Sequence, residues 1–514
     1  MRRRIFQIAV SLTATLFGIG ALGFSASAQG ESARRISSTN PCLLIVLDGL
    51  RPESLSPELM PNLHSLSKKG ATLSAHHAVF PSVAVVNAAS IATGTYPATH
   101  GVLGETILLS QGDAIAIIDM LKSSRGPTEG GLMTTPSLGK ILAARDKKFL
   151  VVTSGAASAS LALLPGNQGG ALIHPDFSHP KSLRANILGT LGTVPGADFT
   201  GRQRDAWAVD AYLEVGLPKV KPDVTILWLA EPARSQFEAG LGSPRSIDAL
   251  REVDKQIGRV LRRHKRLRLK VNVFVTSARG FSSRTGTEDL SVFLVEEGLK
   301  AGVNSDEVVV VDNASIFVEG HDRSRIRRIT EGLQRLDWVG AIYTQQIRVT
   351  HPESFVRGAL SFQAVYMSHP RAPDILVEPA WSYAENEWNS PGTTQGFGMP
   401  GGASSSPYAL RTLLVVAGPD IKRGIKSAVP SAHIDLAPTL CFLQGIDPGD
   451  AMDGRVLHEA LRGGPKPASI EVLRRRHGSQ AAWDGGGHRL TMTEFSVEGV
   501  DYLDFTKVES IKGR

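Results

Sequence analysis

Short apolar runs alternate with longer segments of helical periodicity along most of this chain. Continuous runs of apolar and β-branched residues, each closed by a turn or a polar residue, predict buried strands. They lie at Cys42–Leu47, Thr72–Val79, Phe149–Ser154, Asp223–Ala230, Val271–Thr276 and Arg411–Ala417. Periodic segments predict helices at about 60–69, 138–145, 205–215, 243–267 and 434–445. This alternation predicts an α/β fold in which helices sandwich a largely parallel sheet.

The pattern changes between residues 287 and 371, where strands and helices no longer alternate. Strands at 308–311, 315–318 and 340–345 and an amphipathic helix at 323–336 predict a small α+β insertion there. The core is therefore assigned to residues 41–286 and 372–461, and residues 462–514 to a C-terminal extension. The extension contains short β-like runs at 489–494 and 500–505. Gly- and Ser-rich residues 105–136 predict an irregular loop at the rim of an active site.

The first 28 residues have the layout of a secretory signal peptide. Three arginines follow Met1, an apolar run extends from Ile5 to Phe24, and Ala26-Ser27-Ala28 supplies small residues for cleavage. We expect cleavage after Ala28 and a periplasmic or secreted mature protein. The apolar run is long for a signal, so an uncleaved anchor in the inner membrane is the alternative.

The charge balance is mildly basic, because the formal net charge of +7 falls to +4 once the signal segment is removed. The densest basic runs, 262–270 and 323–328, are interpreted as solvated helix faces and ends. Binding to nucleic acid or to an acidic membrane surface is the alternative, and no specific nucleic-acid partner is expected. The two cysteines, Cys42 and Cys441, lie in apolar segments and are expected to be buried thiols.

Candidate chemistry begins at residues 80–101, which open with Phe-Pro-Ser and continue as an alanine-rich apolar run. Ser82 is expected at the first turn of a helix, where free backbone N–H groups and the helix dipole favour an anion. Asn87 lies five residues further on and can present its amide toward the same helix start. Together these residues predict a cradle for a phosphate or an oxyanion.

Read with Cys-Leu-Leu-Ile-Val-Leu-Asp-Gly-Leu-Arg-Pro at 42–52, this stretch resembles the type I phosphodiesterase / nucleotide pyrophosphatase family of the alkaline phosphatase superfamily. The resemblance extends over about Pro41–Leu461 and implies an alkaline phosphatase-like core. It also implies roles for three residues: Asp48 as a metal ligand, Ser82 as the nucleophile, and Asn87 as a contact of the phosphoryl oxygens. Family members use two divalent metal ions, of the zinc type, to activate the nucleophile and clamp the phosphoryl group.

Most of the remaining metal-ligand positions carry side chains that cannot bind a metal. In Glu-Pro-Ala-Arg-Ser-Gln-Phe at 231–237, Ala233 and Phe237 replace an aspartate and a histidine. In Thr-Ser-Ala-Arg-Gly-Phe at 276–281, Ala278 and Arg279 replace another such pair. The last histidine position corresponds to Pro400 or Gly402, and no histidine occurs between residues 396 and 407. Asp48 is thus the one carboxylate ligand left, which makes a poor zinc site.

These substitutions favour a pseudoenzyme that binds a phosphorylated or other anionic small molecule without a resident metal. Arg279 is expected to pair with Asp48 and to contact the ligand, with Arg234 nearby. His100 is expected to be a framework residue, and His433 to cap or pack rather than to replace a ligand. An active phosphodiesterase or pyrophosphatase with a remodelled two-zinc site and Ser82 as nucleophile is the alternative. A metal-free transferase or esterase that uses arginine charge is a third reading.

Overall fold

The computed structural model describes residues 39–108, 114–116, 132–196, 198–346, 353–395 and 404–512. The described residues from 39 onward belong to one compact unit. The signal segment assigned to residues 1–28 lies outside the described residues. Within the described ranges, no helix combines the length and apolar character needed to cross a membrane.

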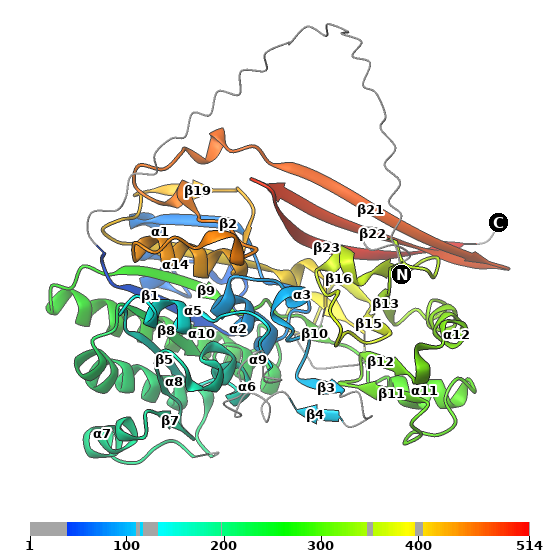
Figure 1. The fold of residues 1–514 in the computed structure, drawn as a ribbon, viewed down its shortest axis with the longest axis horizontal. Coiled ribbons are helices and arrows are strands. Elements are labelled where there is room, and N and C mark those ends of the chain that lie inside the picture. The colour runs from blue at the N-terminus through cyan, green and yellow to red at the C-terminus, as the bar shows by residue number, and fades with distance from the viewer. Residues whose placement is uncertain are drawn as a thin grey trace, which may run out of the picture. The chain divides into compact units, whose positions relative to one another are not determined.

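A ten-stranded sheet runs through the core, in the order β19-β2-β18-β9-β1-β8-β5-β6-β7 with β20 beside β2 (Figure 1). Its centre is parallel: β1 (Cys42–Leu47) lies between β8 (Val224–Leu229) and β9 (Asn272–Ser277), and β5 (Phe149–Thr153) pairs with β8. All residues of these four strands are buried, as continuous apolar runs in a two-sided sheet require. The predicted α/β class is confirmed.

The flanks of the sheet are partly antiparallel. β18 (Arg411–Ala417) is antiparallel to both β9 and β2 (Ala71–His77). The remaining strands are β6 (Ala171–Ile173), β7 (Ser178–His179), β19 (Ile425–Ser427) and β20 (Ser431–Ala432). The sequence does not reveal the direction of β18, because an apolar run looks the same in either orientation.

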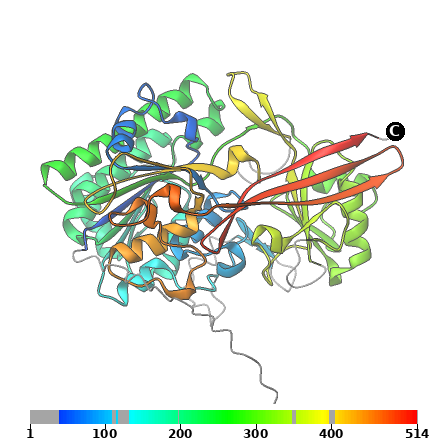
Figure 2. The ribbon, with the colours of Figure 1, turned by 90° about the horizontal axis from the view of Figure 1, so that it is seen from above.

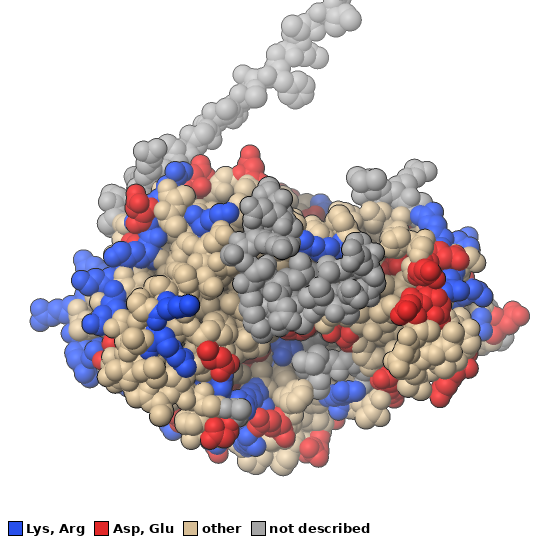
Figure 3. All heavy atoms as spheres, turned by 60° about the horizontal axis from the view of Figure 1, so that its bottom comes forward, with Lys and Arg blue, Asp and Glu red and all other residues tan. Residues whose placement is uncertain are grey.

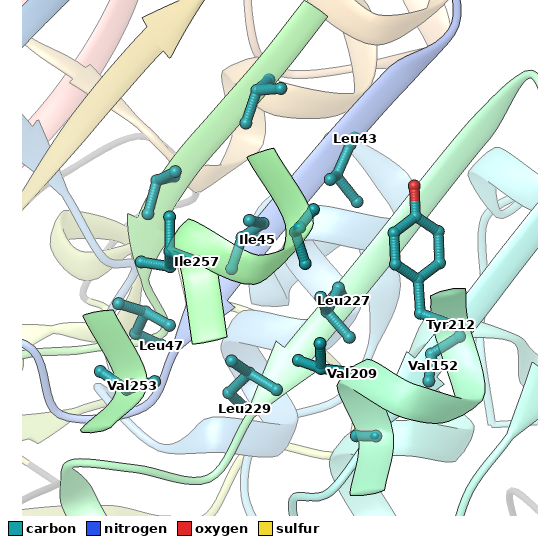
Figure 4. Packing of buried hydrophobic residues seen from close by; sticks show 14 of the residues in the cluster. Leu43, Ile45, Leu47, Val152, Val209, Tyr212, Leu227, Leu229, Val253 and Ile257 are labelled. Carbon is teal, nitrogen blue, oxygen red and sulfur yellow. The ribbon is translucent and has the colours of Figure 1, made fainter. Parts of the chain in front are cut away.

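Helices cover both faces of the sheet. One core cluster joins alternate residues of β1 to α1 (Pro61–Lys69), α8 (Gly201–Asp210) and α10 (Pro244–Arg266). Figure 4 shows the side chains of Ile45 and Leu47 beside Ile257 and Val253 of α10, in the same cluster as Leu43. Further helices pack with one another and against β5: α2 (Ala84–Thr93), α5 (Leu138–Ala143), α6 (Ala157–Leu163) and α14 (Leu436–Leu443).

The insertion forms its own five-stranded sheet, in the order β11-β12-β15-β13-β14. Its strands are β11 (Val308–Val311), β12 (Ser315–Val318), β13 (Val339–Thr344), β14 (Leu360–Ser361) and β15 (Ile375–Pro379). Helices α11 (Leu290–Glu296) and α12 (Arg323–Leu333) pack on it through a separate apolar cluster. The predicted boundary at residue 371 is too early, because β15 pairs with β12 and β13.

The C-terminal extension is a three-stranded antiparallel sheet of long strands (Figure 2). It consists of β21 (Leu473–Trp483), β22 (Gly486–Val497) and β23 (Val500–Lys512). Buried Leu490, Met492 and Leu503 join it to a cluster that includes Tyr343 and Phe362. Asp504 of β23 accepts hydrogen bonds from Nε and Nη2 of Arg411 on β18, at 2.7 and 2.8 Å.

Candidate functional site

The carboxyl ends of β1, β8 and β9 meet at Asp48. Its backbone N–H donates to Leu229 O at 3.0 Å, and its carbonyl accepts from Ala233 N at 2.8 Å. The N–H of Ala278 donates to Leu47 O at 3.1 Å. Gly49 has a φ of +77°, and a Cβ there would lie 2.8 Å from Cβ of Ala233. Positions 48, 233 and 278 are therefore held next to one another, as parallel strand ends place them.

Arg279 forms an ion pair with Asp48, with 3.1 Å between Nε and Oδ1. Their side chains are 12% and 16% exposed, so the pair is largely shielded from water. The predicted pairing is confirmed. A carboxylate in this position without a cation would be costly to desolvate, and the guanidinium offsets that cost.

A pocket of about 320 Å³ opens at this point. Its lining carries one carboxylate and three guanidinium groups, from Asp48, Arg204, Arg234 and Arg279. It also includes Ala233 and Phe237, two of the positions at which ligands were expected to be lost. Phe237 is 56% exposed, so an apolar ring borders the opening. The structure thus brings together Asp48, Ala233, Phe237 and Arg279, as the resemblance implies.

The three arginines are only partly engaged by the described residues. Arg279 uses Nε for Asp48, and within the described ranges its two Nη groups have no hydrogen-bond partner. Arg204 donates through Nη1 to Gly196 O at 3.2 Å, and Arg234 donates through Nε to Glu238 at 3.1 Å. Guanidinium groups are planar donors suited to two oxygens of a phosphate or carboxylate. The pocket therefore offers free donors to an anion.

Buried acids lie beside the pocket, and the sequence analysis did not identify them. Ser154, which lines the pocket, donates to Asp205 at 2.5 Å, and Asp205 also accepts from Ala230 N and Glu231 N. Burial raises the pKa of Asp205 to about 7, with a further contribution from the Glu231 carboxylate. Ser154 follows a parallel strand directly, a position that could have identified it. No comparable signal marks Asp205 in α8.

Ser82 is fully buried and does not line the pocket. Its Oγ donates to Ser404 O at 2.8 Å and accepts from Ser404 N at 3.2 Å. The helix begins later than expected: α2 starts at Ala84 with Val83 as its N-cap, so Ser82 precedes the first turn. The hydroxyl ties the start of α2 to the segment before β18.

Asn87 is also fully buried, and its amide serves the backbone. Its Oδ1 accepts from Val79 N at 2.8 Å, and its Nδ2 donates to Val79 O and Val83 O at 3.2 and 3.1 Å. Nδ1 of His433 lies 2.7 Å from the same Oδ1. This geometry disfavours the predicted contact with phosphoryl oxygens, because Val79, Val83 and His433 hold the amide inside the core. Asn87 instead closes the turn between β2 and α2.

The histidines near this network are buried and neutral. Burial lowers the pKa of His433 to about 3 and that of His100 to about 3. His100 accepts from Val102 N through Nδ1 and contacts Ser90 Oγ through Nε2, which fits the expected framework role. The ring centroids of His76 and His433 lie 5.3 Å apart. The pKa of His76 is also lowered, and burial is the largest cause.

The side chains around Asp48 do not fit a two-metal centre. Across the described parts of the chain, no group of three or more His, Cys, Asp or Glu side chains is placed to hold a metal ion. Around Asp48 stand an alanine, a phenylalanine and a guanidinium, and a cation would be repelled by Arg279. Pro400 and Gly402 lie outside the described residues. Cys42 and Cys441 are buried free thiols, as expected, and burial raises the pKa of each to about 12.

Comparison with known proteins matches most of the chain to one family. The sequence profile of type I phosphodiesterase / nucleotide pyrophosphatase matches residues 42–403. The venom phosphodiesterase of Macrovipera lebetinus is 25% identical over 227 residues, which are 43% of this chain and 23% of the relative. The chain therefore matches less than a quarter of that relative's length.

Solved structures share the fold. Murine ectonucleotide pyrophosphatase / phosphodiesterase 5 is 15% identical, with a TM-score of 0.54 over 80% of this chain and 96% of that one. An inactive variant of the same murine protein is known in complex with AMP. A mutant of the alkaline phosphatase PafA is 14% identical, with a TM-score of 0.61 over 83% of this chain and 100% of that one.

Proposed function

Because this chain belongs to the type I phosphodiesterase / nucleotide pyrophosphatase family, we propose that it is a secreted, metal-independent pseudoenzyme of that family that binds a small phosphate-type anion. The family fold is kept, and the pocket lies at the carboxyl ends of the central strands, where open α/β sheets bind ligands. Within the pocket, arginines take the place of metal charge.

One observation carries this proposal: the Asp48 and Arg279 ion pair lies in a pocket that two further arginines also line. The carboxylate fixes Nε of Arg279, so the rest of the guanidinium is oriented before a ligand arrives. A pre-oriented planar fork can donate two parallel hydrogen bonds to two oxygens of one phosphate.

The other lining residues have complementary roles in the proposal. Arg204 and Arg234 bring positive charge to the lining, which offsets Asp48 and favours an anion. Ser154 remains bound to Asp205 and acts as part of the wall. The exposed ring of Phe237 contacts the apolar part of a phosphate ester. Binding requires no chemical step, and Ser82 in its buried position takes no part in it.

Titration calorimetry on the full chain tests the proposal, with inorganic phosphate and AMP as ligands. We expect binding that weakens as salt concentration rises and at least about tenfold weaker binding for Arg279→Gln, since one charged hydrogen bond contributes about 1.5–3 kcal/mol. Arg251→Gln is the matched control, because Arg251 is an exposed arginine of α10 that pairs with Asp248 outside the pocket. Its affinity should change less than about twofold. Equal affinity of both variants, or no binding to the wild-type chain, would refute the proposal.

A further inference from the structure

A second cavity lies at the opposite, amino-terminal end of the central strands. Its volume is about 580 Å³, within the usual range for small-molecule sites. Cys42 of β1, Thr225 of β8 and Val271, just before β9, line its inner wall. The anion pocket lies at the other ends of the same strands, so the two cavities are distinct.

Most of the wall is apolar. Tyr212, Leu213 and Leu217, from the helical segment that continues α8, form one side. Leu267 and Leu269, which follow α10, form another and are 47% and 40% exposed. Exposed leucines beside an apolar cavity leave a surface that an apolar ligand can cover.

The same lining carries four cations: Lys221, Arg263, Arg268 and Lys270. Arg263 pairs with Glu214 through Nη2 at 3.2 Å, but its Nε is buried without a hydrogen-bond partner among the described residues. Within the same ranges, no carboxylate pairs with Lys221, Arg268 or Lys270. Lys and Arg side chains also crowd the left edge of the face in Figure 3, the side on which α10 ends in Figure 1.

Helix electrostatics explain only part of this charge. Cations in the last turn of a helix interact favourably with its dipole, which accounts for Arg263 in α10. Lys221 is the C-cap of the helical segment Ala211–Val220, so the same effect accounts for it. Arg268 and Lys270 lie beyond the end of α10, and their presence beside apolar walls needs another reason.

We propose that this cavity binds a single-chain amphiphilic anion, namely a fatty acid of twelve or more carbons, with its alkyl chain inside and its carboxylate at the basic rim. The apolar wall buries methylene groups, and unpaired cations at the mouth supply partners for a carboxylate. A membrane surface fits less well, because Tyr212, Leu213 and Thr225 are buried inside the cavity and a flat headgroup layer would leave them untouched.

Displacement of the fluorescent fatty acid cis-parinarate from the full chain tests this proposal. We expect dodecanoate, below its micelle concentration, to displace the probe at about tenfold lower concentration than decanoate, since each buried methylene contributes about 0.8 kcal/mol. Dodecyltrimethylammonium has the same chain with the opposite charge and should displace the probe at least about tenfold less well than dodecanoate.

Charge variants locate the site. The double variant Lys221→Gln and Lys270→Gln should bind dodecanoate at least about tenfold more weakly, because each lysine is exposed and tolerates the change. Lys265→Gln removes a neighbouring exposed charge of α10 that does not line the cavity, and should change affinity less than about twofold. A circular-dichroism signal from the helices equal to that of the wild-type chain verifies that each variant is folded.

Three outcomes of the displacement experiments would overturn the proposal. They are no displacement by dodecanoate, equal displacement by the cationic amphiphile, and equal losses for the double variant and Lys265→Gln. Binding to anionic phospholipid vesicles without binding of monomeric dodecanoate would also overturn it, in favour of a membrane surface. Because neither Lys221 nor Lys270 belongs to the anion pocket, failure here leaves the proposed function untouched.

Discussion

Arg279 is the residue on which the candidate site depends. It stands where the family pattern has a histidine, and it holds the one remaining carboxylate, Asp48. Removing either partner leaves the other charge partly buried without a counter-charge, whereas removing both leaves no such charge. The stability of this pair and its use for ligand binding can therefore be measured separately.

A double-mutant cycle of Asp48→Asn and Arg279→Gln measures the pair. Each single variant should lower the free energy of unfolding by about 1–3 kcal/mol, and the double variant should lose less than the sum, with a coupling of about 1–2 kcal/mol. Urea unfolding provides the measurement. Additive single effects would show that the ion pair does not operate in solution.

Substitutions of Asn87 test whether this residue has a structural role or contacts the ligand. Asn87→Ala leaves the N–H and carbonyl of Val79 without their buried partner, so we expect a loss of about 2–4 kcal/mol in unfolding free energy. Asn87→Asp keeps one acceptor and loses the donors, so it should also destabilise the chain. Phosphate affinity of the folded variants should stay unchanged. A folded Asn87→Ala chain of normal stability that binds phosphate poorly would restore the phosphoryl contact expected from the sequence.

Among single residues, the sequence identifies some members of the candidate site and misses others. Asp48 and Arg279 could be identified because each lies within two residues of a strand end and in a specific motif. The role of Asn87 could not, because the motif does not tell whether an amide faces a ligand or the adjacent turn. Arg204 and Asp205 come to the pocket from α8, and only the packing of that helix places them there.

Among the elements, the C-terminal sheet is attached to the core through buried polar contacts as well as apolar ones. Asp504 on β23 accepts from Arg411 on β18, and its Oδ1 lies 3.2 Å from Nε2 of His77 on β2. The Asp504 carboxylate is nearly fully buried, although its pKa is lowered to about 2, because hydrogen bonds from His77 and Arg411 outweigh the effect of burial.

Asp504→Ala should therefore lower the free energy of unfolding by about 2–4 kcal/mol at pH 7. The folded pKa of Asp504 is below its ordinary value of 3.8, so the carboxylate contributes stability above pH 3.8 that is lost as the pH falls toward 2. Asp501→Ala is the control on the same strand, because its exposed pair with Arg475 should contribute less than about 1 kcal/mol. Equal effects of the two substitutions in urea unfolding would contradict this role for Asp504.

The elements show where sequence patterns succeed. The buried strands of the centre match their predicted ranges closely, because their continuous apolar runs reflect burial on both faces. β21 could not be predicted, since its exposed sequence Leu-Arg-Arg-Arg-His-Gly-Ser-Gln lacks alternation. It is a strand through its pairing with β22 along its whole length.

Across the whole molecule, buried titratable groups act on stability in opposite directions. Asp205 and Glu378 each have a pKa raised by burial to about 7, so their contribution to stability decreases as the pH rises from about 4 to 7. His100 and His433 have a pKa lowered by burial to about 3, so their contribution decreases as the pH falls. Single substitutions separate these contributions.

His433→Gln isolates one of them. Below its ordinary pKa of 6.5, His433 takes up a proton in the unfolded chain but stays neutral in the folded chain until about pH 3. The wild-type chain should therefore lose about 2–3 kcal/mol more than the variant between pH 7 and pH 4. Urea unfolding at the two pH values measures this difference. Parallel losses would show that His433 is accessible to protons in the folded state.

Changes of pattern along the chain predict an α/β core, an α+β insertion and a C-terminal extension. The end of the insertion was misplaced, since β15 reads as another buried strand and only its partners assign it to the second sheet. Which end of the sheet carries a second cavity depends on side-chain packing, which no local pattern encodes.

The central claim is that arginine has replaced metal at the family's site. It is tested most directly by elemental analysis of the purified chain after exposure to zinc or manganese, with hydrolysis of bis(4-nitrophenyl) phosphate assayed on the same sample. We expect less than about 0.1 metal ion per chain and no turnover above that of Ser82→Ala. About two metal ions per chain, with turnover that depends on Ser82, would contradict the claim.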